Sequence, residues 1–198
     1  KIAGSGRIIV ELPGVEDQER VRGLLKSTAK LGFWETYKAR EILPYFEEKV
    51  TILYYYPNMQ PDIIDALVDL GYKGIVIAGT GLGHVNKPVY PALRRAVEKG
   101  VHIYMTVQTL WGYVHMFVYD TGRDLMDLGV IPAENMLPEV AYIKLGWALG
   151  QTTDREEVKK LMLTPINDEI TQKEPYNGYL IYQGGVPEVE AFIRKHHK

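Results

Sequence analysis

The sequence predicts an α/β fold, a three-layer sandwich of the Rossmann or flavodoxin-like kind with a largely parallel sheet between two layers of helices. Apolar runs at residues 50–56, 75–78 and 101–105 have the β-branched and aromatic composition of buried strands. Helical patterns that end at Gly71 and Gly100 alternate with these runs. Because the connections are short, the strands are expected to be parallel and joined by crossover helices.

The first part of the chain predicts a smaller β-α-β unit, which either extends this sheet or lies beside it. Residues 7–12 read as a strand that stops at Pro13, and an amphipathic helix follows Asp17. Residues 31–37 return to strand composition, and a linking helix over residues 38–48 follows. Because the composition changes near residue 50, we predict two domains, residues 1–49 and residues 50–198.

The second part continues with helices and one irregular stretch. One helix starts at Pro61, and another starts at Asn86 or Lys87. Residues 106–122 are rich in aromatic side chains and only weakly periodic, so we predict a functional loop with one embedded strand. Further helices are predicted over residues 137–149 and after a Thr153–Glu156 capping box, then a strand at residues 179–182 and a final amphipathic helix from Pro187.

Composition and charge exclude several classes of protein. The 198 residues have a formal net charge of -2, which gives no electrostatic case for direct nucleic-acid binding. No apolar run approaches the ~20 residues that cross a bilayer, so we expect no membrane association and a cytoplasmic or recombinant protein. The sequence contains no cysteine, which excludes disulfides, thiolate nucleophiles and cysteine metal ligands.

A glycine-rich turn at residues 71–88, GYKGIVIAGTGLGHVNKP, marks the expected site. It follows a buried strand, where open α/β sheets bind their ligands, and glycines let the backbone approach a ligand closely. The spacing is GxGxG and not the GxGxxG of dinucleotide sites. A purely structural turn is an equally good interpretation. The residues that would contact a ligand here are Gly79, Gly81, Gly83 and His84.

Polar residues after the next strand are expected at the same edge of the sheet. Hydroxyl, amide and carboxylate groups together suit a small polar ligand, although loop capping explains them equally well. The aromatic residues of this loop could stack on a base or cover another protein surface, but such a cluster is more often core or subunit interface. The polar candidates are Thr106, Gln108, Tyr119 and Asp120, and the aromatic ones are Trp111, Tyr113, Phe117 and Tyr119.

Metal, cofactor and serine-hydrolase chemistry have little support. His84, His102 and His115 show no HxH or HExxH spacing, so a metal site is not expected. The two serines, Ser5 and Ser27, lie outside any nucleophile elbow. We expect no cofactor.

Two family resemblances refine these expectations. From about residue 50 to 171, and perhaps as far as residue 198, motifs such as YYPNM, GYKGIVIAGTGLGHV, MTVQTLWG and EEVKKLML resemble the C-terminal domain of the asparaginase-like D subunit of archaeal glutamyl-tRNA(Gln) amidotransferases, and more distantly the L-asparaginases. Residues up to about 48, including RIIVELPGV, ERVR and LGFWE, resemble a periplasmic segment of the SecD translocation subunit. Because these families are not expected in one polypeptide, the chain resembles an engineered chimera or a designed fusion.

The resemblance implies an incomplete catalytic apparatus. In asparaginase-type enzymes the threonine nucleophile and the Thr-Asp-Lys cluster belong to an N-terminal domain with TGGT-like and HGTD-like motifs, which this sequence lacks. The C-terminal domain lends groups across a dimer, and His84 stands where the bacterial enzymes carry Asn. The first expectation is therefore a scaffold without catalytic residues of its own, which pairs as a homodimer or with a missing N-terminal domain. The alternatives are an amidohydrolase fragment that contributes to ammonia release from asparagine or glutamine, and a protein-translocation component.

Overall fold

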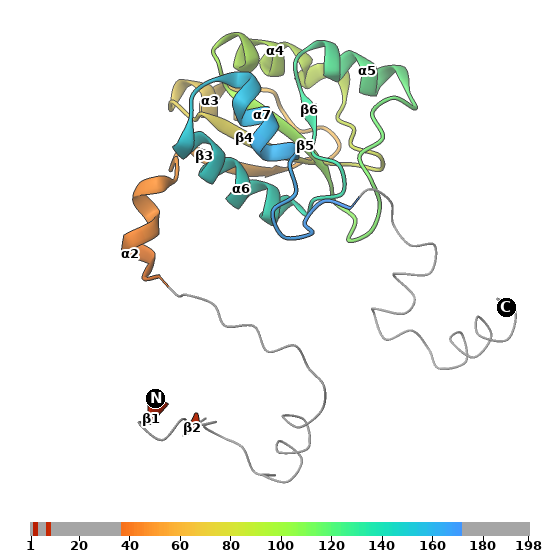
Figure 1. The fold of residues 1–198 in the computed structure, drawn as a ribbon. Coiled ribbons are helices and arrows are strands. Elements are labelled where there is room, and N and C mark those ends of the chain that lie inside the picture. The colour runs from red at the N-terminus through yellow and green to blue at the C-terminus, as the bar shows by residue number, and fades with distance from the viewer. Residues whose placement is uncertain (1, 4–6, 9–36, 172–198) are drawn as a thin grey trace, which may run out of the picture. The chain divides into compact units, whose positions relative to one another are not determined.

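The computed structural model describes residues 2–3, 7–8 and 37–171 of the chain (Figure 1). The chain divides into two compact units, Lys1–Lys38 and Ala39–Lys198. In the first unit, β1 (Ile2–Ala3) and β2 (Arg7–Ile8) pair as an antiparallel ladder. The strand predicted at residues 7–12 is thus found over its first two residues, paired with β1. The helix after Asp17 and most of the strand at residues 31–37 lie outside the described residues.

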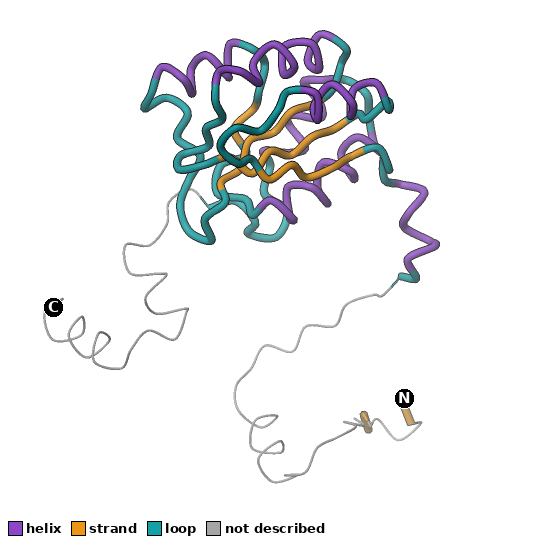
Figure 2. The backbone as a smooth tube through the Cα atoms, turned by 180° about the vertical axis from the view of Figure 1, so that it is seen from behind, coloured by secondary structure: helices purple, strands orange, loops and turns teal. Residues whose placement is uncertain are grey.

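The second unit is built on a parallel sheet of four strands in the order β3-β4-β5-β6. Helices lie above and below the sheet, as Figure 2 shows from behind. The predicted α/β fold with a largely parallel sheet is therefore confirmed. The strands are β3 (Val50–Tyr54), β4 (Gly74–Gly79), β5 (His102–Val107) and β6 (Ile131–Pro132).

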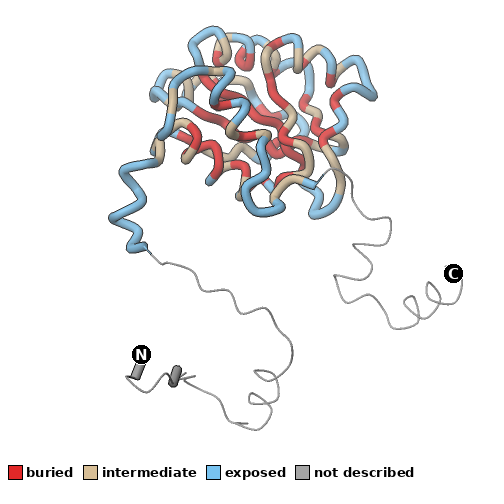
Figure 3. The backbone as a smooth tube through the Cα atoms, viewed as in Figure 1, coloured by how far each residue is buried: buried red, intermediate tan, exposed pale blue. Residues whose placement is uncertain are grey.

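Alternation along the central strands produces two separate cores. Every residue of β4 and β5 is buried, as expected for parallel strands covered on both faces (Figure 3). Ile75 and Ile77 face one core, whereas Val76 and Tyr104 face the other. The first core is covered by α3 (Asp62–Asp69), α4 (Tyr90–Glu98) and α5 (Asp120–Asp127), and the second by α6 (Pro138–Gln151) and α7 (Arg155–Leu163).

The linking segment before β3 packs on α6. It forms α2 (Ala39–Ile42) and a 3-10 turn, η1 (Leu43–Tyr45), in which Pro44 interrupts the predicted linking helix. A Cβ atom at Gly150 would lie 2.0 Å from the Tyr45 carbonyl oxygen, so the two backbones touch. The structure thus groups residues 39–49 with the second unit, while our division into residues 1–49 and 50–198 stays a prediction.

Three local predictions differ from the structure. The embedded strand expected within residues 106–122 is not found, because β5 runs on to Val107 and residues 108–119 form neither helix nor strand. The helix α5 is not evident from the sequence because its segment, DTGRDLMD, carries a glycine and four charges. The cap of α7 is Asp154 and not Thr153, since the Asp154 side chain accepts a hydrogen bond from Glu157 N at 2.8 Å.

The described helices include none that is both long and apolar enough to cross a membrane. The strand at residues 179–182 and the helix from Pro187 lie outside the described residues.

Candidate functional site

The site begins where β4 ends, at a turn in which Gly79 and Gly81 are required for different reasons. A Cβ atom at Gly79 would lie 2.7 Å from Met105 Sδ and 2.9 Å from His84 N, so no side chain fits there. Gly81 has φ +53° and nothing within 4 Å of an added Cβ, so its backbone conformation, and not a lack of space, favours glycine. The turn is therefore tightly packed at its base and open at its tip.

The turn closes on itself. Thr80 N donates to the His84 carbonyl at 3.0 Å, and Gly83 N and His84 N both donate to the Thr80 carbonyl at 3.0 Å. These three N–H groups are therefore engaged within the turn and do not form a cradle for an anion. The 3-10 turn η2 (Lys87–Val89) then leads into α4, so the glycine turn does not run directly into a helix.

His84 is held against the start of α5. Its Nδ1 lies 3.3 Å from Thr121 Oγ1, and its ring meets the Tyr119 ring edge-on with the centroids 5.5 Å apart. Burial lowers the pKa of His84 below its ordinary 6.5, so the imidazole is neutral at pH 7. Its buried Nε2 has no hydrogen-bond partner among the residues that the structure describes. One imidazole nitrogen is thus buried and unsatisfied at this edge of the sheet.

Thr106 and Gln108 tie the strands together. Thr106 is fully buried, and its hydroxyl donates to the Ile77 carbonyl at 3.1 Å. Gln108 Nε2 donates to the Ala78 carbonyl at 2.9 Å and to the Tyr55 carbonyl. These contacts join the carboxyl ends of β3, β4 and β5, so the two side chains shape the edge of the sheet from within.

Tyr119 and Asp120 lie at the start of α5. Tyr119 is its N-cap residue, and Asp120 Oδ1 accepts a hydrogen bond from Thr121 N at 2.8 Å. The structure therefore brings Tyr119 beside His84, while the Asp120 side chain bonds the first turn of its own helix. Sequence reasoning missed Tyr90, whose hydroxyl donates to the Thr121 carbonyl at 3.0 Å and so fixes the start of α5 against α4.

The aromatic side chains of residues 108–119 are largely exposed. Phe117 is 71% exposed and Tyr119 is 55% exposed, so they do not belong to the core of this domain. Tyr113 stacks on His115 with the centroids 5.7 Å apart. His115 N in turn donates to the Leu82 carbonyl at 3.0 Å, which joins this loop to the glycine turn. An apolar surface thus adjoins His84.

A small hollow of about 270 Å³ also lies at this edge of the sheet. It lies where β3 ends, and the Tyr55 hydroxyl there accepts a hydrogen bond from Asn86 N at 3.1 Å. The sequence signal that could have found it is YYYPNMQP, a strand followed by a turn in which Asn58 has φ 66°. Its lining residues are Tyr55, Asn58, Met59, Gln60, Pro61, Asn86 and Pro88.

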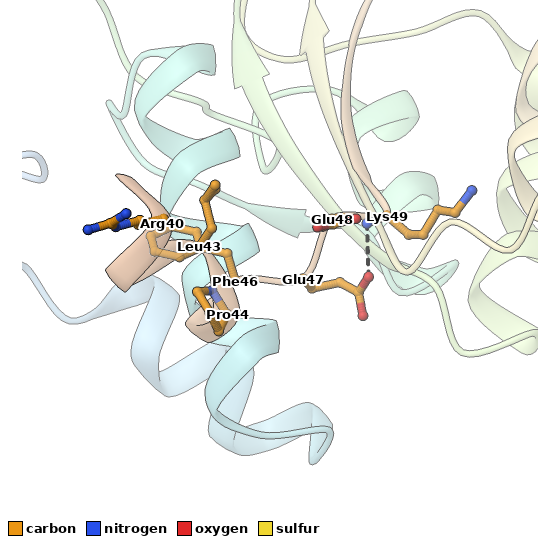
Figure 4. Close-up of a pocket in the computed structure, with 7 residues that line it drawn as sticks. All are labelled: Arg40, Leu43, Pro44, Phe46, Glu47, Glu48 and Lys49. Carbon is orange, nitrogen blue, oxygen red and sulfur yellow. Dashed lines mark hydrogen bonds between the residues drawn. The ribbon is translucent and has the colours of Figure 1, made fainter. Parts of the chain in front are cut away.

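A larger hollow beside the linking segment belongs to the opposite edge of the sheet. It has a volume of about 490 Å³, and Glu47 Oε1 accepts a hydrogen bond from Lys49 N at 2.8 Å on its rim (Figure 4). Because it precedes β3, it lies at the amino end of the strands, away from the glycine turn. No group of three His, Cys, Asp or Glu that could hold a metal occurs among the described residues.

The fold and the site together define the class of protein. It is a parallel α/β domain with a glycine turn and an aromatic loop at the carboxyl edge of its sheet. The sequence profile of the glutaminase/asparaginase C-terminal domain matches residues 49–162. The chain belongs to this family. A second profile, the N-terminal part of the P1 domain of the SecDF protein translocase subunit, matches residues 1–38, most of which lie outside the described part of the chain.

Curated relatives and solved structures agree with this assignment. The chain is 54% identical to the D subunit of the glutamyl-tRNA(Gln) amidotransferase of Thermococcus kodakarensis over 68% of this chain, and 54% identical to that of Pyrococcus abyssi over a similar span. It spans only 31% of either relative. The thermostable L-asparaginase from Thermococcus kodakarensis superposes with a TM-score of 0.60 and 32% identity, covering 65% of this chain and 39% of that one. The chain thus carries an asparaginase-like C-terminal domain similar to part of these proteins.

Proposed function

We propose that this chain supplies the C-terminal side of an amidohydrolase site and has no hydrolytic activity by itself. The observation that carries the proposal is the buried Nε2 of His84, which has no partner among the described residues and lies at the carboxyl edge of the sheet beside an exposed aromatic loop. A neutral imidazole there accepts or donates one hydrogen bond to a small polar ligand, such as the amide or carboxylate of asparagine or glutamine.

The nucleophile is proposed to come from a separate domain. The chain covers 31% of the amidotransferase D subunits that it resembles, which leaves ample sequence in those proteins for another catalytic domain. Among the described residues at this edge, Thr121 places its hydroxyl oxygen 3.3 Å from Nδ1 of the His84 ring. That separation exceeds the usual reach of a nucleophile and its base, and no third group among the described residues orients the ring through Nε2.

We propose Gly81, His84 and Tyr119 as the ligand-facing group, and Gly79, Gly83, Thr106, Gln108 and Asp120 as the residues that support it. Gly81 allows a partner's backbone or a substrate to approach the turn, since nothing lies within 4 Å of an added Cβ there. The exposed side chains of Phe117 and Tyr119 would then be covered by the partner, either a second copy or an N-terminal asparaginase domain.

A complementation assay tests this function. The chain is mixed with the Thermococcus kodakarensis D subunit truncated before the region that it matches, and ammonia release from asparagine and glutamine is measured. We expect activity in the mixture and at least a tenfold loss with His84→Ala. The control Arg94→Ala, at an exposed position on α4, should retain full activity. Equal activity with His84→Ala would contradict the role of the imidazole.

We further propose that residues 1–48 are foreign to the family domain, which makes the chain a chimera. Two unrelated family profiles match its two parts, and the match to the asparaginase family begins at residue 49. The test is to compare the coding sequence with the genome of the source organism. A native reading frame that contains both parts would overturn the chimera, while the proposed amidohydrolase role would still stand.

A further inference from the structure

The helix α6 is apolar on most of its surface, with Glu139, Lys144 and Gln151 as its charged and amide residues. Ala141, Leu145 and Ala148 are fully buried against the sheet. Val140, Ile143 and Trp147 form a second stripe at positions i, i+3 and i+7 of the same helix, and Ile143 is 56% exposed. Apolar stripes on two sides of a helix are normally both buried. The outer stripe therefore needs a cover.

A groove of about 800 Å³ runs along this outer stripe. The linking segment before β3 contributes Phe46, and the segment after α7 contributes Ile166, which is 64% exposed. The groove is thus wide enough for apolar side chains from another segment. Its lining residues are Phe46, Glu139, Val140, Ile143, Lys144, Trp147, Ile166, Asn167 and Glu169.

The central charges in this groove are already satisfied. Lys144 Nζ lies 2.5 Å from Glu169 Oε1 and donates to the Thr164 carbonyl at 2.7 Å. Glu169 also accepts hydrogen bonds from Ile166 N and Asn167 N. Because Lys144 and Glu169 neutralise each other, the groove favours an apolar occupant over a charged small molecule.

The end of the described chain is anchored beside this groove. Thr171 N donates to Asn135 Oδ1 at 3.0 Å, and Asn135 Nδ2 donates to Thr171 Oγ1 at 2.8 Å. Asn135 comes three residues before the start of α6 at Pro138, so the chain continues from the amino end of the helix that needs covering.

The sequence that follows contains a matching apolar stripe. In residues 187–198, PEVEAFIRKHHK, the apolar side chains Val189, Phe192 and Ile193 recur at i, i+3 and i+4, the spacing of an amphipathic helix. The chain from Thr171 to Val189 can extend up to ~60 Å. The stripe on α6 is only about 10 Å long, so the connection reaches it easily.

We propose that residues 187–198 fold back as a helix and place Val189, Phe192 and Ile193 over the outer stripe of α6. The basic residues Arg194 and Lys195 then remain in solvent or approach Glu139 on the groove rim. This intramolecular cover does not depend on the proposed amidohydrolase role.

The absence of cysteine from the sequence allows a clean test in the full chain. The variant Ile143→Cys introduces a single thiol into the groove, and its reaction rate with a thiol reagent is measured at several protein concentrations. We expect a rate at least tenfold slower than that of an unfolded control, and independent of protein concentration. Adding Phe192→Asp should restore fast reaction. Adding Ala191→Asp, on the opposite face of the predicted helix, should leave the thiol protected.

Other occupants give different results. Protection that increases with protein concentration would indicate a second copy and would overturn the proposal. A thiol that reacts rapidly without Phe192→Asp would show an uncovered groove. If the thiol at position 143 stays protected in the Phe192→Asp variant, another segment covers the groove, and this would overturn the proposal. As a second measurement, mild oxidation of the Ile143→Cys, Phe192→Cys pair should give an intramolecular disulfide, seen as a monomer about two mass units lighter than its reduced form.

Discussion

Replacing Lys144 by methionine should strongly destabilise the domain, because it removes one half of a buried ion pair. The Lys144 side chain is 5% exposed and that of Glu169 is 12% exposed. Burial alone would raise the pKa of Glu169, but hydrogen bonds from Lys144 and from the N–H groups of Asn167 and Ile166 outweigh it and lower that pKa from 4.5 to about 2. This difference corresponds to about 3 kcal/mol of folding stability.

The pH dependence follows from the lowered pKa. A carboxyl group that is more acidic in the folded state than in the unfolded state stabilises the fold above about pH 4.5 and loses this effect as the pH falls toward 2. Removing one partner of a buried ion pair typically costs roughly 3–5 kcal/mol, so urea unfolding at pH 7 should show Lys144→Met to be about 3 kcal/mol less stable than the parent. The gap should shrink markedly at pH 3.

Two variants control this experiment. Lys159→Met changes an exposed lysine on α7 and should alter stability by no more than about 0.5 kcal/mol. Combining Lys144→Met with Glu169→Gln should recover much of the loss, because no unpaired charge then remains buried. A Lys144→Met protein as stable as its parent at pH 7, or equally destabilised at pH 7 and pH 3, would refute the reasoning.

Three further perturbations test the packing around the site. Gly122→Ala should lower the free energy of unfolding in urea by about 3 kcal/mol, because its Cβ would lie 2.2 Å from the Met116 carbonyl oxygen. Gly81→Ala has free space and should lower it by only about 1 kcal/mol, because φ at this position is +53°. The proton NMR titration of His84 should have a midpoint below 6.5, and its protonation should reduce stability as the pH falls through that midpoint; a midpoint of 6.5 or higher would contradict its burial. Thr106→Val should cost about 1 kcal/mol by removing a buried hydroxyl bond, and an unchanged unfolding midpoint would argue against that bond.

The central sheet could be predicted because its strands are apolar and its turns are marked by glycine. The run at residues 75–78 lies within β4, and the predicted helix at residues 137–149 lies almost entirely within α6. The strand β6 escaped prediction because it is only two residues long, Ile131–Pro132, and has no periodicity to detect. Local pattern therefore predicted β4 and α6, and it missed the short strand β6 and the charged helix α5.

The contacts of the candidate site could not be predicted from local pattern. His84 meets Thr121 across 37 positions of sequence, and Lys144 meets Glu169 across 25. Gln108 lies at the carboxyl edge of the sheet, and its amide is bonded to two strand-end carbonyls instead of facing outward. Contacts between side chains that are far apart in the sequence depend on how the elements pack together. A single sequence does not reveal this packing.

Hydrolysis by the purified chain alone decides whether the site is composite. Ammonia release from asparagine and from glutamine is measured without any added domain, on the parent and on Thr106→Ala and Thr121→Ala. The proposed role as one side of a composite site predicts no release above the buffer rate in any of the three proteins. Hydrolysis by the parent that either substitution abolishes would show that the chain contains its own catalytic threonine and would contradict a composite site.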